Sequence, residues 1–253
     1  MEIWQAVAIA AAGVAAGTIN TIVGSGTLIT FPTLLAFGIP PVTANVSNSI
    51  GLVPGSITGA IGYRRELVGQ RARVLRLLSA SLIGGVVGAV LLLTLPAGAF
   101  EAIVPVLILL GVVLVVVQPR VSAWVADRRE ARGDHSGADA RWVWPATLAT
   151  GVYGGYFGAA QGVLLMGVLG IGVRESLQRS NAVKNVLAAA VNGVSGIVFI
   201  VVADVDWLVV LLVAVGAVIG GLIGARVGRR LPSWALRSVI VVVGLVAVTT
   251  LLV

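Results

Sequence analysis

The sequence has no cysteine and a single histidine, His135, among its 253 residues. Disulfides and thiolate metal sites are therefore excluded, and no second histidine or thiol is present to complete a metal site around His135. We interpret His135 as a solvated loop residue and expect neither a metal nor a cofactor. An enzyme working inside a membrane would need a nucleophile with its base or a metal cluster, so we do not expect catalysis.

Charge is equally scarce. Charged side chains make up 11% of the chain and hydrophobic ones 58%, whereas soluble domains average about 25% charged residues. So few charges cannot cover a water-soluble surface. The apolar runs reach about 18 to 22 residues, which is enough for a helix to cross roughly 30 Å of hydrocarbon. The sequence therefore predicts an all-α, polytopic membrane protein. Glu2 precedes the first run without any Lys or Arg, so this run lacks the positive start of a signal peptide and is interpreted as a retained helix.

The length of each apolar stretch distinguishes two kinds of helix. The stretches fall at 3–23, 27–38, 43–63, 75–95, 101–117, 143–160, 163–173, 181–203, 207–226 and 235–253. The second and the seventh are too short to span, because a helix of about 12 residues reaches only about 18 Å. We expect both to be re-entrant or half-membrane helices, which are tolerated only where protein or a water-filled cavity surrounds them.

Arginine placement predicts the orientation in the cell membrane. The arginines lie in four loops: Arg64, Arg65, Arg71, Arg73 and Arg76; Arg120, Arg128, Arg129, Arg132 and Arg141; Arg174 and Arg179; and Arg226, Arg229, Arg230 and Arg237. Such loops are typically cytoplasmic. The turns at 40–41, 96–101 and 204–206 hold no Lys or Arg and should face outside, which places both termini outside. The net charge of +7 is then explained by membrane lipids rather than by nucleic acid.

The two halves of the chain resemble each other. The polar stretch 118–142 is predicted to be a cytoplasmic linker between a first repeat, 1–117, and a second repeat, 143–253, of one integral membrane domain. A shift of 136 residues superposes Gly26 on Gly162, Asn45 on Asn181, Gly84-Gly85 on Gly220-Gly221, and Gly88-Ala89 on Gly224-Ala225. Each repeat would hold about four spanning helices and one short helix, in opposite orientations. Secondary transporters use this inverted-repeat plan, with the substrate site near the midplane.

The first candidate site is the pair of turns that precede the short helices. In the first half it comprises Asn20, Thr21, Gly24, Ser25 and Gly26, and in the second half Gln161 and Gly162. Glycine permits a sharp turn, and the following helix start points free N–H groups and a positive dipole end at an anion. The alternative is that these glycines only allow close helix packing. Polar side chains would be wasteful at a dry packing interface.

The second candidate site lies at the start of the next helix in each half. It comprises Asn45 and Asn48 in the first half and Asn181, Lys184 and Asn185 in the second. Their spacing of three and four residues places them on one stripe of a helix, and polar groups in lipid are costly unless they face a partner or a cavity. Lys184 is the only lysine and corresponds to Asn48. It would either contact the substrate or extend to the cytoplasmic interface.

Carboxylates are absent from the predicted membrane interior. Glu66, Glu101, Glu175, Asp204 and Asp206 all fall at predicted interfaces. This argues against a cation pump and favours a small inorganic or organic anion as the partner. An anion that leaves a negative cell gains about 2.3 kcal/mol per charge per 100 mV, so export could be driven by the potential. Proton coupling through Glu175 or water is an alternative, as is an anion channel of similar architecture.

These segments resemble a known family. The resemblance rests on 16–32, 41–45 and 63–67 in the first half and on 157–164, 180–185 and 204–207 in the second. They are similar to the two repeats of the TauE/SafE sulfite exporter family. The resemblance implies a transporter of small sulfur-containing anions such as sulfite or sulfonates. In place of the family's glycine-rich second turn the sequence has Ala159-Ala160-Gln161-Gly162, so that Gln161 would add an amide to one side of the site.

Overall fold

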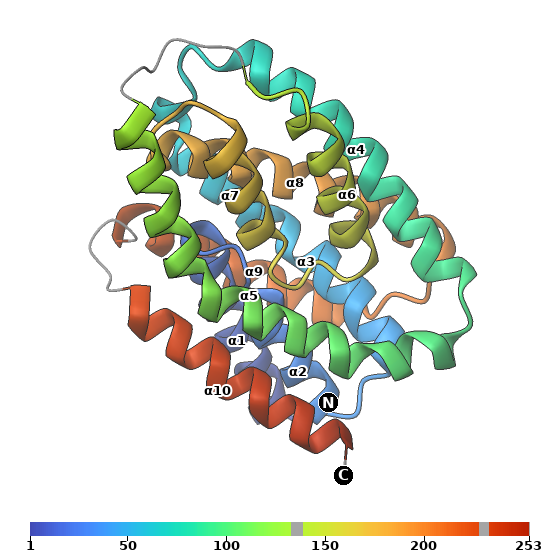
Figure 1. Ribbon diagram of the computed structural model, residues 1–253. Coiled ribbons are helices and arrows are strands. Elements are labelled where there is room, and N and C mark those ends of the chain that lie inside the picture. The colour runs from blue at the N-terminus through green and yellow to red at the C-terminus, as the bar shows by residue number, and fades with distance from the viewer. Residues whose placement is uncertain (133–138, 228–232, 253) are drawn as a thin grey trace.

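The fold is helical throughout the part of the chain that the computed structural model describes, residues 1–132, 139–227 and 233–252. His135, Arg229 and Arg230 lie outside these residues. The helices are α1 (Ile3–Ile22), α2 (Thr27–Ala36), α3 (Pro41–Gly62), α4 (Arg71–Thr94), α5 (Ala97–Arg132), α6 (Val143–Tyr156), α7 (Gln161–Gly172), α8 (Leu177–Val202), α9 (Trp207–Val227) and α10 (Ser233–Leu252), with a short 3-10 helix, η1 (Arg64–Leu67), before α4 (Figure 1). The prediction of an all-α protein is confirmed.

Helix length and hydropathy support a multi-pass membrane protein. Within the described residues, five helical segments are long and apolar enough to cross a membrane: α1, α4, residues 98–121 of α5, α8 and α9. Helices α2 and α7 are apolar but only 10 and 12 residues long, as the short stretches predicted. Helix α6 is shorter than the predicted stretch 143–160. It has 14 residues and ends at Tyr156, because the chain turns at Gly158 with a φ of +76°.

Helix α5 extends further than the sequence indicated. It contains 36 residues and continues to Arg132, so the first part of the predicted linker 118–142 is helical. The linker was recognised by its polar composition, which reports contact with water rather than backbone conformation. Ala and Arg, which are frequent between 120 and 132, are both good helix formers. Figure 1 shows α5 as one long helix along the side of the bundle.

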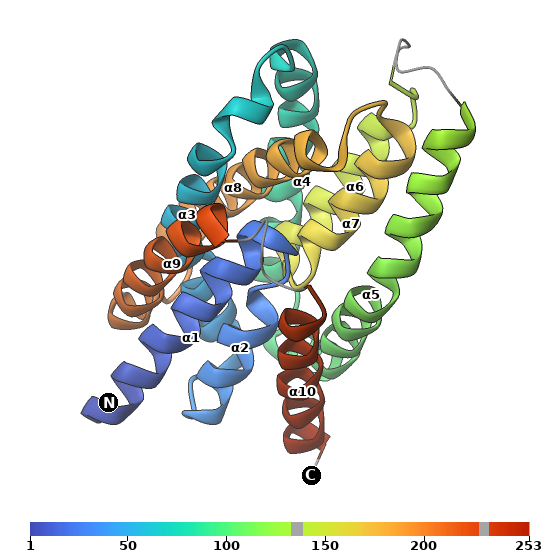
Figure 2. The same ribbon diagram turned by 90° about the vertical axis from the view of Figure 1, so that its left-hand side faces the viewer.

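Helices of the two halves pack in a matching order. Helix α1 lies along α9, as α6 lies along α4, and α3 packs against α9 as α8 packs against α4. Small residues bring the backbones into contact: a Cβ at Gly17 would lie 2.3 Å from the carbonyl oxygen of Ala217, and one at Gly88 would lie 2.1 Å from that of Val152. Close approach through small residues is typical of membrane helices. The short α2 lies between α1 and α10 (Figure 2).

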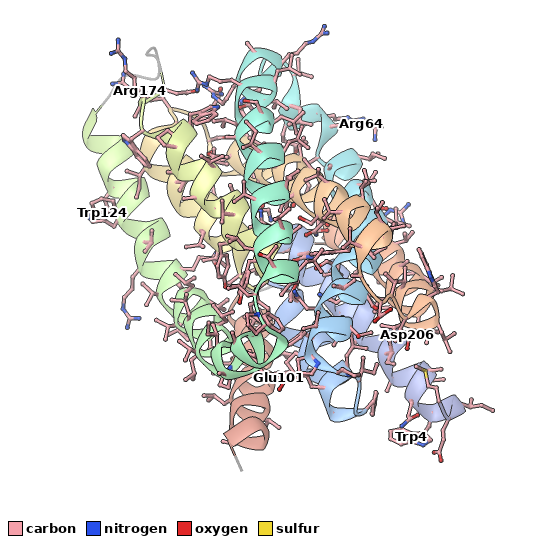
Figure 3. The ribbon with its side chains drawn as sticks, turned by 90° about the vertical axis from the view of Figure 1, so that its right-hand side faces the viewer. Trp4, Arg64, Glu101, Trp124, Arg174 and Asp206 are labelled. Atoms are coloured by element: carbon pink, nitrogen blue, oxygen red, sulfur yellow. The ribbon has the colours of Figure 1, made fainter. Side chains whose placement is uncertain are left out.

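The arginine-rich loops and the loops without arginine lie at opposite ends of the bundle. Figure 3 places Arg64 and Arg174 at one end and Trp4, Glu101 and Asp206 at the other. The start of α1 and the end of α10 lie at the latter end (Figure 1). This separation agrees with the predicted alternation of loops along the chain. The assignment of the arginine-rich end to the cytoplasm stays a prediction.

A network of ion pairs lies at the arginine-rich end of the bundle. Arg73 at the start of α4 contacts Asp139 at 2.9 Å and Glu175 at 2.9 Å. Glu175, in the loop before α8, also pairs with Arg179 at 2.5 Å. Burial opposes ionisation of the Glu175 carboxyl, but hydrogen bonds from Arg179 and Arg73 outweigh it and hold its pKa below the usual value. The network joins α4, the segment before α6 and the start of α8.

Candidate functional site

The turns that precede the two short helices touch each other. The chain turns between α1 and α2 at Gly24, with a φ of +91°, and between α6 and α7 at Ala160, with a φ of +60°. The N–H of Gly162 donates a hydrogen bond to the carbonyl oxygen of Gly24 at 2.9 Å. A Cβ on Gly162 would lie 2.4 Å from the Cα of Gly24. Only glycine fits at either position, because a side chain on one would overlap the backbone of the other.

A small polar cavity lies beside this contact. Its volume of about 20 Å³ is enough for about one water molecule. The cavity is lined by Asn20, Thr21, Gly24, Thr27, Ser56, Gly158, Gln161, Gly162, Asn185, Ala188 and Asn192. The lining contains amides, hydroxyls and backbone but no carboxylate. Six of the predicted site residues are among these, whereas Ser56 and Asn192, near the middle of α3 and of α8, were not predicted to line a site.

Asn20 joins the two sides of the first turn. Its side-chain oxygen accepts a hydrogen bond from the N–H of Gly26, at the start of α2, at 2.8 Å. An amide oxygen thus occupies the helix N-terminus at which we predicted an anion. The neighbouring Ser25 is buried, and its hydroxyl has no hydrogen-bond partner within the described residues.

Three predicted residues of α8 cover the C-terminal end of α1. The Nζ of Lys184 donates to the carbonyl oxygens of Asn20 at 2.9 Å and Thr21 at 3.4 Å. The Nδ2 atoms of Asn181 and Asn185 donate to the Thr21 carbonyl at 3.3 and 3.4 Å. Lys184 is 0% exposed, so its ammonium does not extend to the membrane interface. Because the last carbonyls of a helix lack intrahelical donors, these side chains satisfy groups that the break in the chain leaves open.

The matching residues of α3 also bond to other helices of the bundle. The Nδ2 of Asn45 donates to the carbonyl oxygen of Tyr156, the last residue of α6, at 3.0 Å. Asn48 accepts a hydrogen bond from Thr30 at 2.5 Å and donates to Thr27 at 3.4 Å, so it holds α2 against α3. Neither Asn45 nor Asn48 lines the cavity. In this conformation the amides predicted to bind an anion are used to fix helix ends.

Gln161 supplies an unused donor at the cavity. Its side chain packs so close to Gly154 of α6 that a Cβ there would lie 2.3 Å from the Gln161 side-chain carbonyl carbon. The Nε2 of Gln161 is buried and has no hydrogen-bond partner in the described part of the chain. A buried donor without a partner is costly. A water molecule or an anion in the cavity would satisfy it.

The side chains around the cavity determine which ligands it could bind. Residues 1–132, 139–227 and 233–252 contain no group of three or more His, Cys, Asp or Glu side chains that could hold a metal ion. The cavity offers neutral donors from amides and hydroxyls, and the Lys184 ammonium lies one hydrogen bond behind its wall. Such surroundings favour an anionic ligand over a cation.

Comparison with known proteins assigns the family. A profile of the family described as sulfite exporter TauE/SafE matches residues 9–251. The chain belongs to the TauE/SafE family. The resemblance identified in the sequence is thereby confirmed. No solved structure matches the chain at a significant level.

Several curated relatives of this TauE/SafE protein carry transporter names. The chain is 28% identical over 152 residues to the probable membrane transporter protein YfcA of Escherichia coli K12, a match that covers 58% of this chain and 52% of the relative. It is 33% identical over 94 residues to the probable membrane transporter protein ORF9 of a Sinorhizobium species, covering 37% of this chain and 36% of the relative. The match therefore spans about half the length of the first relative and less of the second.

Proposed function

We propose that this protein is a secondary transporter that exports small sulfur-containing anions, such as sulfite or sulfonates, across the plasma membrane. The observation that supports the proposal most directly is the polar cavity beside the Gly24–Gly162 contact, where the two broken-helix turns meet and no carboxylate lines the wall. Secondary transporters bind substrate between two such breaks near the midplane. Family membership and the names of the relatives point to transport as well.

An inverted repeat is part of this proposal, and glycine contacts support it. A Cβ at Gly85 of α4 would meet Val191 and Val194 of α8, and one at Gly221 of α9 would meet Gly55 and Thr58 of α3. The two contacts are equivalent, because the shift of 136 residues relates Gly85 to Gly221, Gly55 to Val191, and Thr58 to Val194. The same shift relates Ser56 to Asn192, and both line the cavity. A cavity lined by an equivalent pair lies where a two-fold axis between the repeats would pass.

The size of the cavity implies that it opens during transport. At about 20 Å³ it is too small for a sulfonate, since a water-sized occupant already fills it. Loading therefore requires the two turns to separate or rotate. Rocking of one repeat against the other would expose the cavity first to one side of the membrane and then to the other.

Flux measurements in inside-out vesicles test the proposed function. Labelled sulfite, sulfoacetate, methanesulfonate and sulfate are added outside, with and without an imposed potential. We expect saturable uptake of at least one sulfur-containing anion. Vesicles preloaded with the same anion in unlabelled form should take up the labelled anion faster than empty vesicles. Uptake that rises linearly with concentration, without this counterflow, would indicate a channel. Absence of flux for all four anions would contradict the proposal.

A variant pair tests whether the cavity is the binding site. Asn192→Ala removes a cavity amide, and loss of one hydrogen bond to a buried anion costs about 1–3 kcal/mol, so KM should rise by roughly fivefold to a hundredfold. Gly193→Ala is the matched control, because nothing lies within 4 Å of the added Cβ. An unchanged KM in Asn192→Ala, together with an unchanged KM in Ser56→Ala, would place the substrate elsewhere.

A further inference from the structure

Lys184 is an ionisable side chain in the interior of the bundle, and within the described residues no carboxylate forms an ion pair with it. Its side chain is completely buried. Among the elements packed against α8, helices α1, α3, α6 and α7 contain no Asp, Glu, His, Lys or Arg. The charged residues of the remaining elements lie toward the arginine-rich end: Arg71, Arg73 and Arg76 at the start of α4, and Arg64, Arg65 and Glu66 in η1. Tyr153 and Tyr156 are the titratable groups of α6.

Backbone carbonyls provide the hydrogen bonds that Lys184 makes. An ammonium has three N–H groups, and two of them donate to the Asn20 and Thr21 carbonyl oxygens at the end of α1. The C-terminal end of a helix carries a partial negative charge, which favours a cation there. Partial charges do not replace a counter-ion, however, and a buried charge with only dipoles around it is poorly compensated.

The matching position in the first half holds an asparagine with different partners. Asn48 corresponds to Lys184, and it bonds within its own half to Thr27 and Thr30 of α2. The residues equivalent to these threonines in α7 are Val163 and Met166, which offer no hydroxyl. Lys184 instead reaches across to α1. The two halves therefore differ by one ionisable side chain at equivalent places.

The ammonium lies directly behind the cavity wall. Asn20 and Thr21, whose carbonyls it contacts, both line the cavity, and so does the adjacent Asn185. An anion in the cavity would therefore lie close to the Lys184 charge in surroundings with few other charges. Coulomb attraction is strong in such a low-dielectric interior.

We propose, on the basis of the transport function proposed above, that Lys184 is protonated in the carrier and serves as its internal counter-charge. A monovalent anion at the cavity then forms a carrier whose bundle interior has no net charge, whereas the empty carrier has a charge of +1. The membrane potential acts on the return of the empty carrier rather than on the loaded step. Because the return of a positive carrier is drawn toward a negative cell interior, this arrangement also favours export.

Tracer exchange at a saturating anion concentration reports on the movement of the loaded carrier alone, because the empty carrier is then rarely formed. Net efflux also requires the return of the empty carrier. Purified protein in liposomes is loaded with methanesulfonate on both sides, and tracer exchange is compared at 0 and −100 mV. Methanesulfonate remains ionised at all pH values used, so it carries no proton. A full charge crossing 100 mV corresponds to a rate change of up to about 50-fold. We expect wild-type exchange to change less than about twofold and net efflux to change several-fold. Wild-type exchange that responds as strongly as net efflux overturns the inference without any variant.

Substitutions then assign the effect to Lys184. In Lys184→Gln the loaded carrier has a charge of −1, so exchange should become voltage-dependent by more than about threefold. Lys184→Arg and the double variant Lys184→Asn, Asn48→Lys keep one interior cation and should restore voltage-independent exchange. If Lys184 only caps α1, Lys184→Gln lowers thermal stability but leaves exchange independent of voltage, which overturns the inference. If wild-type protein moves none of the four anions, the proposed function fails and this inference with it.

Discussion

The contact between Gly24 and Gly162 provides the sharpest test of the site geometry. In Gly162→Ala the added Cβ would lie 2.4 Å from the Gly24 Cα and 2.9 Å from its carbonyl oxygen. Both distances are far below normal contact, and the neighbouring atoms belong to backbone that cannot rotate away. The two turns must separate, and the hydrogen bond from the Gly162 N–H to Gly24 lengthens or breaks.

The size of the effect follows from two contributions. Overpacking of a tight interior costs about 1–3 kcal/mol, and a buried donor or acceptor left without a partner costs about 1–3 kcal/mol. Because relaxation reduces both, we expect a loss of about 2–4 kcal/mol in total. For a chain of this size each kcal/mol lowers the midpoint of thermal unfolding by about 2–4 °C. Gly162→Ala should therefore unfold about 4–16 °C below wild type in detergent.

Gly167→Ala is the matched control for this measurement. Gly167 lies in the same short helix, and nothing is found within 4 Å of a Cβ added there. Replacing a helical glycine by alanine stabilises a helix by about 1 kcal/mol, so this variant should unfold at or slightly above the wild-type temperature. A midpoint for Gly162→Ala that equals or exceeds that of Gly167→Ala would refute the close approach of the two turns.

Three further predictions concern other parts of the molecule. Asn45→Asp should impair folding and flux more than Asn45→Leu, because a carboxylate would face the Tyr156 carbonyl at the negative end of α6; equal expression and flux of the two variants would contradict this. The lowered pKa of Glu175 stabilises the fold above the ordinary glutamate pKa of about 4.3, and this contribution is lost as pH falls through the lowered value. Glu175→Gln should thus lower the unfolding temperature at pH 7 but much less at pH 3.5, and the same deficit at both pH values would show that the ion pairs are irrelevant. Finally, in the cysteine-free background a single cysteine at 205 should react with an impermeant thiol reagent outside the cell, whereas one at 69 should not; labelling at 69 would invert the orientation.

The helices could be predicted from sequence because bilayer thickness sets the lengths of apolar runs. The stretches 3–23 and 207–226 differ from Ile3–Ile22 and Trp207–Val227 by one residue at an end. The short helices were also predicted, since their runs are too brief to span. The end of α5 was not, because polar residues beyond the membrane are compatible with helix and loop alike.

The partners of the polar side chains could not be predicted. A polar residue in a membrane helix indicates that a partner exists, but not whether the partner is a ligand or a helix end. Asn45 bonds to the Tyr156 carbonyl, 111 positions away, and Asn181 to that of Thr21, 160 positions away. Both pairs depend on how the two halves pack. Ser56 in α3 and Asn192 in α8 could have been found from the sequence. They are polar residues within apolar helices, and the shift of 136 residues superposes them.

The hydrogen bonds inside the site explain how a carrier could load an anion without a large change in free energy. In this conformation the Gly26 N–H is bonded to the Asn20 side chain and the Gly162 N–H to the Gly24 carbonyl. At these two N–H groups an incoming anion would therefore exchange with existing acceptors, whereas the Nε2 of Gln161 is a donor without a partner in the described residues. Each exchange replaces one hydrogen bond by another, and a typical net hydrogen bond contributes only about 0.5–1.5 kcal/mol. Binding held near this level would permit release on the far side. Under the proposed mechanism, the Lys184 charge rather than the number of donors would then select anions.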